Sequence, residues 1–141
     1  MIVPKPLTPG FSVAGQVSIG DLPHIAATYR TLINNRPDGE EPGQPSSADL
    51  EAAARSLGLH YAHIPVTGQI SAKDVAVFVK ALSNVRGPTL AFCRTGNRST
   101  RLWALSQAGK RSVRRILAAA ANAGYDLDSL EPRLLQAAPA K

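Results

Sequence analysis

A short apolar segment that leads directly into a glycine-containing loop is the feature that most constrains the fold of this chain. Residues 89–92 read Thr-Leu-Ala-Phe, and Cys93, the only cysteine, follows at once. The loop runs through Gly96 to Arg98, and a helix is predicted from about residue 99. A buried strand, a tight turn and a helix form the unit of parallel α/β sheets, which bind ligands at the carboxyl ends of their strands. Cys93 is therefore predicted at a ligand-binding edge of such a sheet.

The rest of the chain alternates strand-like and helix-like segments in the same way. One predicted helix begins with the capping box of Ser71 and Asp74 and carries Val75, Val79 and Leu82 on one face. Strands are predicted at 11–15, 30–34, 59–64 and 89–92, and helices at 18–29, 46–57, 71–86, 99–108, 112–123 and 127–137. This alternation predicts an α/β fold with a mainly parallel sheet of four to five strands and helices on both faces.

The residues around Cys93 favour a reactive thiol over an inert one. A lone cysteine is most often a small buried hydrophobe. Here Arg94, Gly96 and Arg98 all lie within five residues of it, and helix N-termini and adjacent cations lower the pKa of cysteine thiols to roughly 3.5–7.5. The glycine allows a positive φ, so that successive N–H groups converge on one point. We expect a nucleophile at the floor of an anion pocket.

Other side chains of the loop have supporting roles. Arg98 offers a planar fork for a tetrahedral oxyanion or a sulfur oxyanion. The hydroxyl of Ser99 or Thr100 either donates to the sulfur or caps the following helix. The predicted catalytic residues are Cys93 and Arg98, and the predicted anion-binding loop comprises Arg94, Thr95, Gly96, Asn97 and Ser99.

Accessory candidates at four positions lie elsewhere in the chain. Arg36 either lines the pocket or pairs with Asp38. Asp38 and Glu40 lie in a long loop rich in turn residues, where they are either solvated or able to swing over the pocket as a substitute acid. His63, at a predicted strand end beside a proline, is interpreted as a structural histidine in preference to a catalytic one.

Composition limits the class of protein. With 141 residues, 44% of them hydrophobic, the chain is predicted to form one domain over residues 1–141. A single cysteine excludes an intrachain disulfide, and the histidines lack ligand spacing, so neither a metal nor a cofactor is predicted. Residues 1–10 lack the apolar stretch of a secretory signal, and no segment approaches the length of a membrane span. We therefore expect a soluble, cytoplasmic protein.

The net charge of +6 raises the question of a polyanionic partner. The cluster at 110–115 reads Lys-Arg-Ser-Val-Arg-Arg and could contact phosphates. Only 5% of residues are aromatic, however, so platforms on which bases could stack are scarce. We interpret the cluster as a solvated basic face that attracts small anions, and we do not expect nucleic acid as a partner.

Several separated motifs, in order, carry a resemblance to a known family. They lie at 11–16, 21–22, 33–40, 44–47, 63–66 and 92–99. Over about residues 3–110 the chain resembles the phosphatase-like domain of the beta-lactamase-hydrolase-like family, whose members are also labelled as bacterial sulfurtransferases. The resemblance implies a cysteine-phosphatase-like fold in which the Cys93 loop cradles an anion. Some relatives are fused to a metal-dependent persulfide-oxidising domain, which implies a persulfide-oxidising protein as a partner.

The spacing of the loop bears on the reaction. Protein tyrosine phosphatases place five residues between the cysteine and the arginine and a histidine before the cysteine, whereas here four residues intervene and Phe92 precedes Cys93. The shorter loop resembles that of rhodanese sulfurtransferases. The segment where related phosphatases carry a general acid reads Thr67-Gly68-Gln69, and the next carboxylate, Asp74, belongs to the capping box. A thiolate leaving group needs no such acid.

These observations predict a cysteine-dependent sulfurtransferase in which Cys93 carries sulfane sulfur as a persulfide. Arg98 and the loop amides would stabilise the persulfide, and Arg94 would attract an anionic sulfur donor. The alternative is a phosphatase-like hydrolase that takes a phosphate ester through a phosphocysteine. A further alternative is a non-catalytic persulfide sensor or polyanion-binding module. The donor, the acceptor and the oligomeric state stay open.

Overall fold

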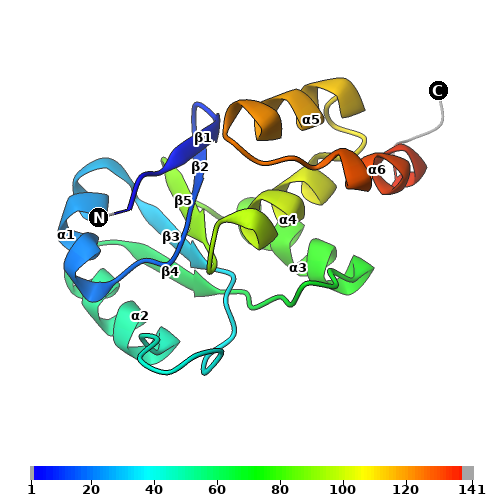
Figure 1. The fold of residues 1–141 in the computed structure, drawn as a ribbon. Coiled ribbons are helices and arrows are strands. Elements are labelled where there is room, and N and C mark those ends of the chain that lie inside the picture. Colours follow the sequence, from blue (N-terminus) through cyan, green and yellow to red (C-terminus); the bar gives the residue numbers. More distant parts are fainter. Residues whose placement is uncertain (1, 138–141) are drawn as a thin grey trace.

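The fold is a five-stranded sheet with helices on both faces, seen in a computed structural model that describes residues 2–137 (Figure 1). The strands are β1 (Lys5–Thr8), β2 (Phe11–Ala14), β3 (Thr31–Asn34), β4 (His60–His63) and β5 (Thr89–Phe92). Their order in the sheet is β1-β2-β5-β3-β4, with β1 antiparallel to β2 and the other pairs parallel. The strand that precedes Cys93 is therefore the central one.

The helices divide into two layers because successive strand residues point to opposite faces of the sheet. Leu32, Leu90 and Phe92 pack in one core with α1 (Leu22–Thr28) and α2 (Ser47–Ser56). Ile33 and Ala91 pack in the other core. That second core is covered by α3 (Ala72–Leu82), α4 (Asn97–Gln107), α5 (Val113–Asn122) and α6 (Glu131–Ala137), with the 3-10 turn η2 (Asp128–Leu130) directly before α6. The other 3-10 turn, η1 (Ile19–Asp21), precedes α1 in the opposite layer. The predicted fold class is confirmed.

The structure departs from the sequence-based elements in three places. The four predicted strands are present, and β1 is added as an edge strand, where Pro6 costs no ladder hydrogen bond. The helix predicted over 18–29 is divided into η1 and α1, with Pro23 in the first turn of α1. In α3 the fully buried side chain is that of Phe78, whereas the predicted Val79 is only partly buried. None of the helices within residues 2–137 is long and apolar enough to cross a bilayer.

Candidate functional site

Cys93 lies at the carboxyl end of β5, in the middle of the sheet. Its backbone N–H donates to the carbonyl of Ala14 at the end of β2, 3.4 Å away. Its sulfur accepts a hydrogen bond from the backbone N–H of Gly96, with 3.1 Å between Sγ and N. The residue is only 1% exposed. The sulfur thus faces a backbone donor at the start of the following helix, as the sequence predicts.

The loop owes its curvature to Gly96, whose φ is +92°. This left-handed conformation strongly favours glycine. It turns the chain so that α4 begins at Asn97, two residues earlier than predicted, and the positive end of the helix dipole points at the loop. Gln16, two residues after the end of β2, supports the loop, because its N–H donates to the carbonyl of Arg94 at 3.1 Å.

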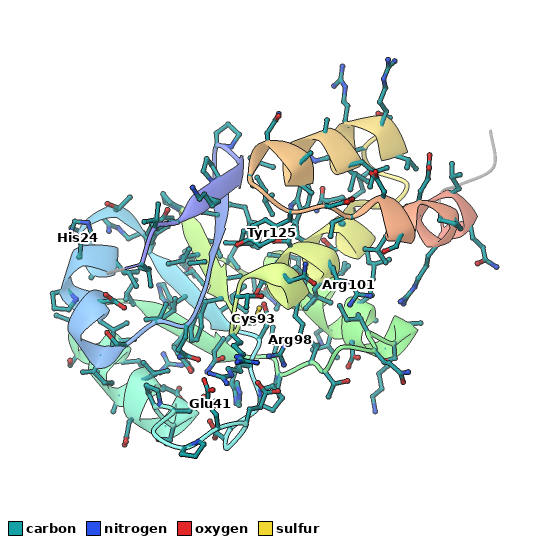
Figure 2. All side chains as sticks on the ribbon, in the orientation of Figure 1. His24, Glu41, Cys93, Arg98, Arg101 and Tyr125 are labelled. Atoms are coloured by element: carbon teal, nitrogen blue, oxygen red, sulfur yellow. The ribbon has the colours of Figure 1, made fainter. Side chains whose placement is uncertain are left out.

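Arg98 closes the loop and is held from two sides. Its Nη1 donates to the carbonyl of Val66 at 2.9 Å, and Nη1 and Nη2 donate to the two carboxylate oxygens of Glu40, both at 2.8 Å. The side chain is 15% exposed. The hydrogen bonds to Glu40 raise the pKa of Arg98 above its usual value, and the neighbouring Cys93 contributes. Figure 2 shows Cys93 and Arg98 at the same end of the sheet.

Arg36 pairs with Glu40 and Glu41, so the interpretation that it pairs with Asp38 is wrong. Its side chain is 2% exposed, with Nε on Glu40 at 2.7 Å, Nη2 on Glu41 at 3.0 Å and Nη1 on Gln16 Oε1 at 2.8 Å. Such a buried guanidinium needs all its partners, because an unpaired buried charge is costly. Arg36 therefore joins Glu40 and Glu41 of the long loop to Gln16, which supports the Cys93 loop.

The carboxylates of the long loop do not act as a substitute acid in this arrangement. The hydrogen bonds from Arg98, opposed by burial and reinforced by Arg36, lower the pKa of Glu40 from 4.5 to about 2. The carboxyl is therefore ionised at neutral pH and has no proton to give. Asp38 Oδ1 accepts the N–H of Ser47 at 2.8 Å, at the start of α2. Asp38 and Glu40 are both exposed, in keeping with a solvated turn, and their carboxylates also bind protein groups.

Two hydroxyls that could have faced the sulfur are engaged elsewhere. Ser99 Oγ, fully buried, donates to Asn35 Oδ1 at 2.8 Å, and Thr100 Oγ1 donates to the carbonyl of Gly96 at 2.7 Å. The expected hydroxyl-to-sulfur bond is thus replaced by the backbone donor. Nε2 of His63 lies 2.8 Å from the carbonyl of Arg36, in keeping with the structural interpretation of this histidine.

The remaining loop side chains lie at the surface. Arg94 is 64% exposed, with its nearest carboxylate, Glu41, 4.0 Å away. Thr95 and Asn97 are exposed as well, and the Thr95 hydroxyl accepts the Asn97 N–H at 3.3 Å. Arg94 is therefore free to meet an anion that approaches from solvent.

Sequence reasoning missed four residues that build this site: Gln16, Asn35, Glu41 and Tyr125. Gln16 and Asn35 come from segments that carry the family resemblance, so their motifs were a usable signal, and Glu41 directly follows one of these segments. Tyr125 lies beyond those segments, yet its hydroxyl donates to the carbonyl of Thr95 at 3.1 Å. Nothing in the sequence around it marks it as a site residue.

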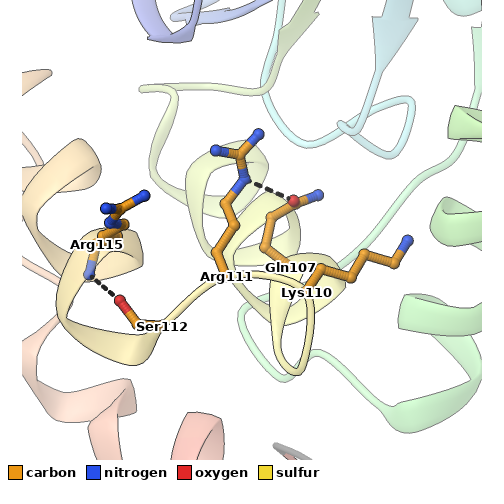
Figure 3. Close-up of a pocket in the computed structure, with 5 residues that line it drawn as sticks. All are labelled: Gln107, Lys110, Arg111, Ser112 and Arg115. Atoms are coloured by element: carbon orange, nitrogen blue, oxygen red, sulfur yellow. Dashed lines mark hydrogen bonds between the residues drawn. The ribbon is translucent and has the colours of Figure 1, made fainter.

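The basic cluster lines a hollow whose lining does not include Cys93, and Figure 3 shows the residues that surround it. The hollow measures about 760 Å³ and is lined by Gln107, Lys110, Arg111, Ser112 and Arg115. It lies at the N-terminal end of α5, whereas Tyr125 follows the other end of that helix. Ten helical residues span about 15 Å. Exposed arginines and a lysine here fit the solvated basic face predicted from the sequence.

The site defines a class of protein: an α/β domain with a cysteine at the end of its central parallel strand and a short loop closing on an arginine. Residues 5–110 match the sequence model of the phosphatase-like domain of beta-lactamase hydrolase-like proteins. A beta-lactamase hydrolase-like protein of Agrobacterium fabrum is 39% identical over 99 residues, or 69% of this chain. The chain belongs to this family.

The chain matches only part of its curated relatives, whereas it matches solved structures over most of their length. The match covers 23% of the Agrobacterium fabrum protein, so this chain corresponds to about a quarter of its curated relative. An inferred phosphatase from Neisseria meningitidis superposes with a TM-score of 0.84 at 33% identity, over 94% of this chain and 96% of its own. Tk-PTP in its active form superposes with a TM-score of 0.75 over 94% of this chain and 93% of its own, but at 15% identity it shows the fold alone. The fold is phosphatase-like.

Proposed function

We propose that this chain is an enzyme in which the Cys93 thiolate accepts a group from a small anionic substrate. The observation that carries the proposal is the hydrogen bond from the Gly96 N–H to the Cys93 sulfur, inside a loop closed by Arg98. The amide and the guanidinium both favour negative charge at this point. Arg94, exposed at the rim, would draw the substrate in.

The proposed reaction proceeds without a protein acid. Glu40 is held ionised, Asp38 caps the start of α2, and the segment after Val66 contains no carboxylate before Asp74. General acids accelerate the departure of poor leaving groups by about 10²–10⁴. We therefore expect substrates whose leaving group departs readily as an anion.

Sulfane-sulfur transfer fits this geometry best. The Cys93 thiolate would attack the outer sulfur of a donor such as thiosulfate, forming an S–S bond to the protein. The donor's own S–S bond breaks, and sulfite leaves with the electron pair. An acceptor thiolate then takes the outer sulfur from the Cys93 persulfide and restores the Cys93 thiolate. The four-residue spacing between Cys93 and Arg98 supports a loop small enough to surround a persulfide.

Phosphate ester hydrolysis is the second candidate, and the comparisons favour it. The family description and the structural neighbours carry phosphatase names. Here the Cys93 thiolate would attack phosphorus, the ester oxygen would leave with its electron pair, and water would then hydrolyse the phosphocysteine. Without a protein acid, we expect this reaction to be confined to activated aryl esters.

One experiment separates the candidates. The purified chain and Cys93→Ser are treated with thiosulfate or glutathione persulfide, and separately with p-nitrophenyl phosphate. A mass increase of one sulfur atom, present only with Cys93 and removed by dithiothreitol, supports sulfur transfer. Rapid phosphate release without a persulfide supports the hydrolase. Absence of both reactions in the folded chain would overturn the proposed enzyme.

A further inference from the structure

Tyr125 contacts the Cys93 loop from a part of the chain outside the matched family region, which ends at residue 110. Its place is set by the end of α5. The N–H of Gly124 bonds to the carbonyl of Ala121 at 2.9 Å, and that of Tyr125 to the carbonyl of Ala120 at 2.8 Å. With Gly124 at φ +98°, this is the Schellman motif that ends many helices. This turn therefore places the Tyr125 ring beside the Cys93 loop.

The hydroxyl of Tyr125 and the sulfur of Cys93 bind the two ends of one peptide unit. The Thr95 carbonyl accepts the Tyr125 hydroxyl at 3.1 Å, and the N–H of the same peptide, that of Gly96, donates to Cys93 Sγ at 3.1 Å. In a trans peptide the C=O and N–H point in opposite directions. Holding the carbonyl on one side therefore aims the N–H at the sulfur on the other. A hydrogen bond to the carbonyl also polarises the amide and strengthens its N–H as a donor.

The packing around Gly96 also places Tyr125 against the Cys93 loop. A Cβ built at this position would overlap the Tyr125 hydroxyl and lie 3.3 Å from the Ala14 carbonyl carbon. The phenol thus lies directly against the bend of the loop, at the end of the sheet that also holds Cys93 (Figure 2). Partial burial raises the pKa of Tyr125 above its ordinary value, and the neighbouring Cys93 raises it further. The hydroxyl therefore stays protonated and available as a donor.

We propose that Tyr125 is a positioning residue for Cys93. Its hydroxyl holds the peptide between Thr95 and Gly96 so that the N–H stabilises the thiolate. The segment after residue 110 thereby contributes to the reactivity of the site. The inference rests on the proposed function only in taking Cys93 as the nucleophile.

The test compares three proteins: the unmodified chain, Tyr125→Phe, which removes only the hydroxyl, and Tyr29→Phe. Tyr29 is a matched control because it packs against the core on the other face of the sheet. The readouts are the ultraviolet absorbance of the Cys93 thiolate at neutral pH, the rate of alkylation by iodoacetamide, and thermal unfolding. Since Cys93 is the only cysteine, both thiol signals belong to it. We expect Tyr125→Phe to alkylate about two- to tenfold more slowly, as for the loss of one hydrogen bond, while Tyr29→Phe alkylates at the original rate.

The outcomes separate this inference from the proposed function. If the unmodified chain reacts no faster than a free thiol, the proposed nucleophile fails and the role of Tyr125 fails with it. If the unmodified chain reacts fast and Tyr125→Phe matches it, this inference alone is overturned. A lower melting temperature of Tyr125→Phe with an unchanged thiolate signal would likewise show a purely structural tyrosine.

Discussion

Replacing Glu40 by glutamine should lower the stability of the protein in a way that depends on pH. The carboxylate accepts hydrogen bonds from both Arg36 and Arg98, and Arg36 is only 2% exposed. Glutamine keeps the shape of the side chain but loses the charge that both guanidinium groups face. At neutral pH the substitution therefore removes an ionic interaction that joins the long loop to the Cys93 loop.

The size of the effect follows from the titration of Glu40. A pKa that falls from 4.5 to about 2 on folding corresponds to at most about 3 kcal/mol of stability. Since 29% of the side chain stays exposed, solvent screening reduces this to about 1–2 kcal/mol. Because the folded pKa is the lower one, this stability is complete above about pH 5. It is lost as the pH falls from 4.5 toward 2.

Urea unfolding of the natural chain and Glu40→Gln at several pH values tests this directly. Other carboxylates titrate equally in both proteins, so the difference between their unfolding free energies isolates Glu40. We expect a difference of about 1–2 kcal/mol near neutral pH that shrinks toward zero near pH 2. A matched control is Glu51→Gln, whose exposed pair with Arg55 should contribute less than about 1 kcal/mol. A difference for Glu40→Gln that stays constant with pH would refute the reasoning.

Three further predictions concern the loop and the core. Arg98→Lys should lower turnover by about 10²–10³-fold while the chain stays folded, because a lysine cannot supply the fork; near-normal kinetics would show that Arg98 does not contact the reacting group. Gly96→Ala should cost about 1–3 kcal/mol in urea unfolding, because its φ is +92°. An added Cβ would also overlap the Tyr125 hydroxyl, so Tyr125→Phe should reduce the cost only in part, because the ring carbon Cζ stays 2.9 Å from the Cβ; an equal cost in that background would contradict this. Phe78→Ala should cost about 3–5 kcal/mol, because the ring is fully buried and packs edge-on against Phe11 at 6.2 Å; a loss below about 1 kcal/mol would contradict its place in the core.

The features that sequence reasoning captured are those encoded locally. The capping box of Ser71 and Asp74 is confirmed, with Asp74 N donating to Ser71 Oγ at 3.1 Å. The strand that ends before Cys93 and the glycine bend that follows it are also present. Each of these depends on residues a few positions apart, where propensity and capping rules apply directly. The edge strand β1 was not predicted because Pro6 within it, and Pro4 and Pro9 on either side, are typical of a loop.

The partners of the site residues were not predictable in the same way, because they come from distant segments. Arg98 and Glu40 are 58 residues apart, and Ser99 and Asn35 are 64 apart. Only the adjacency of β3 and β5 in the sheet brings these pairs together. A charged residue such as Arg36 is predicted to be exposed when it lies in a turn-rich segment. Its burial is explained only by its three partners, which the sequence does not identify.

The arrangement of the second core has a practical consequence for anyone who divides this chain into fragments. The matched family region ends at residue 110, but Ile116, Ala120, Leu130 and Leu134 are buried against the same face of the sheet as Ala91. A fragment cut at 110 would uncover that face to water, and contiguous exposed apolar surface promotes aggregation. We therefore expect the unit that folds to extend past the end of the family match, and the expression of a stable domain to need the helices that follow residue 110.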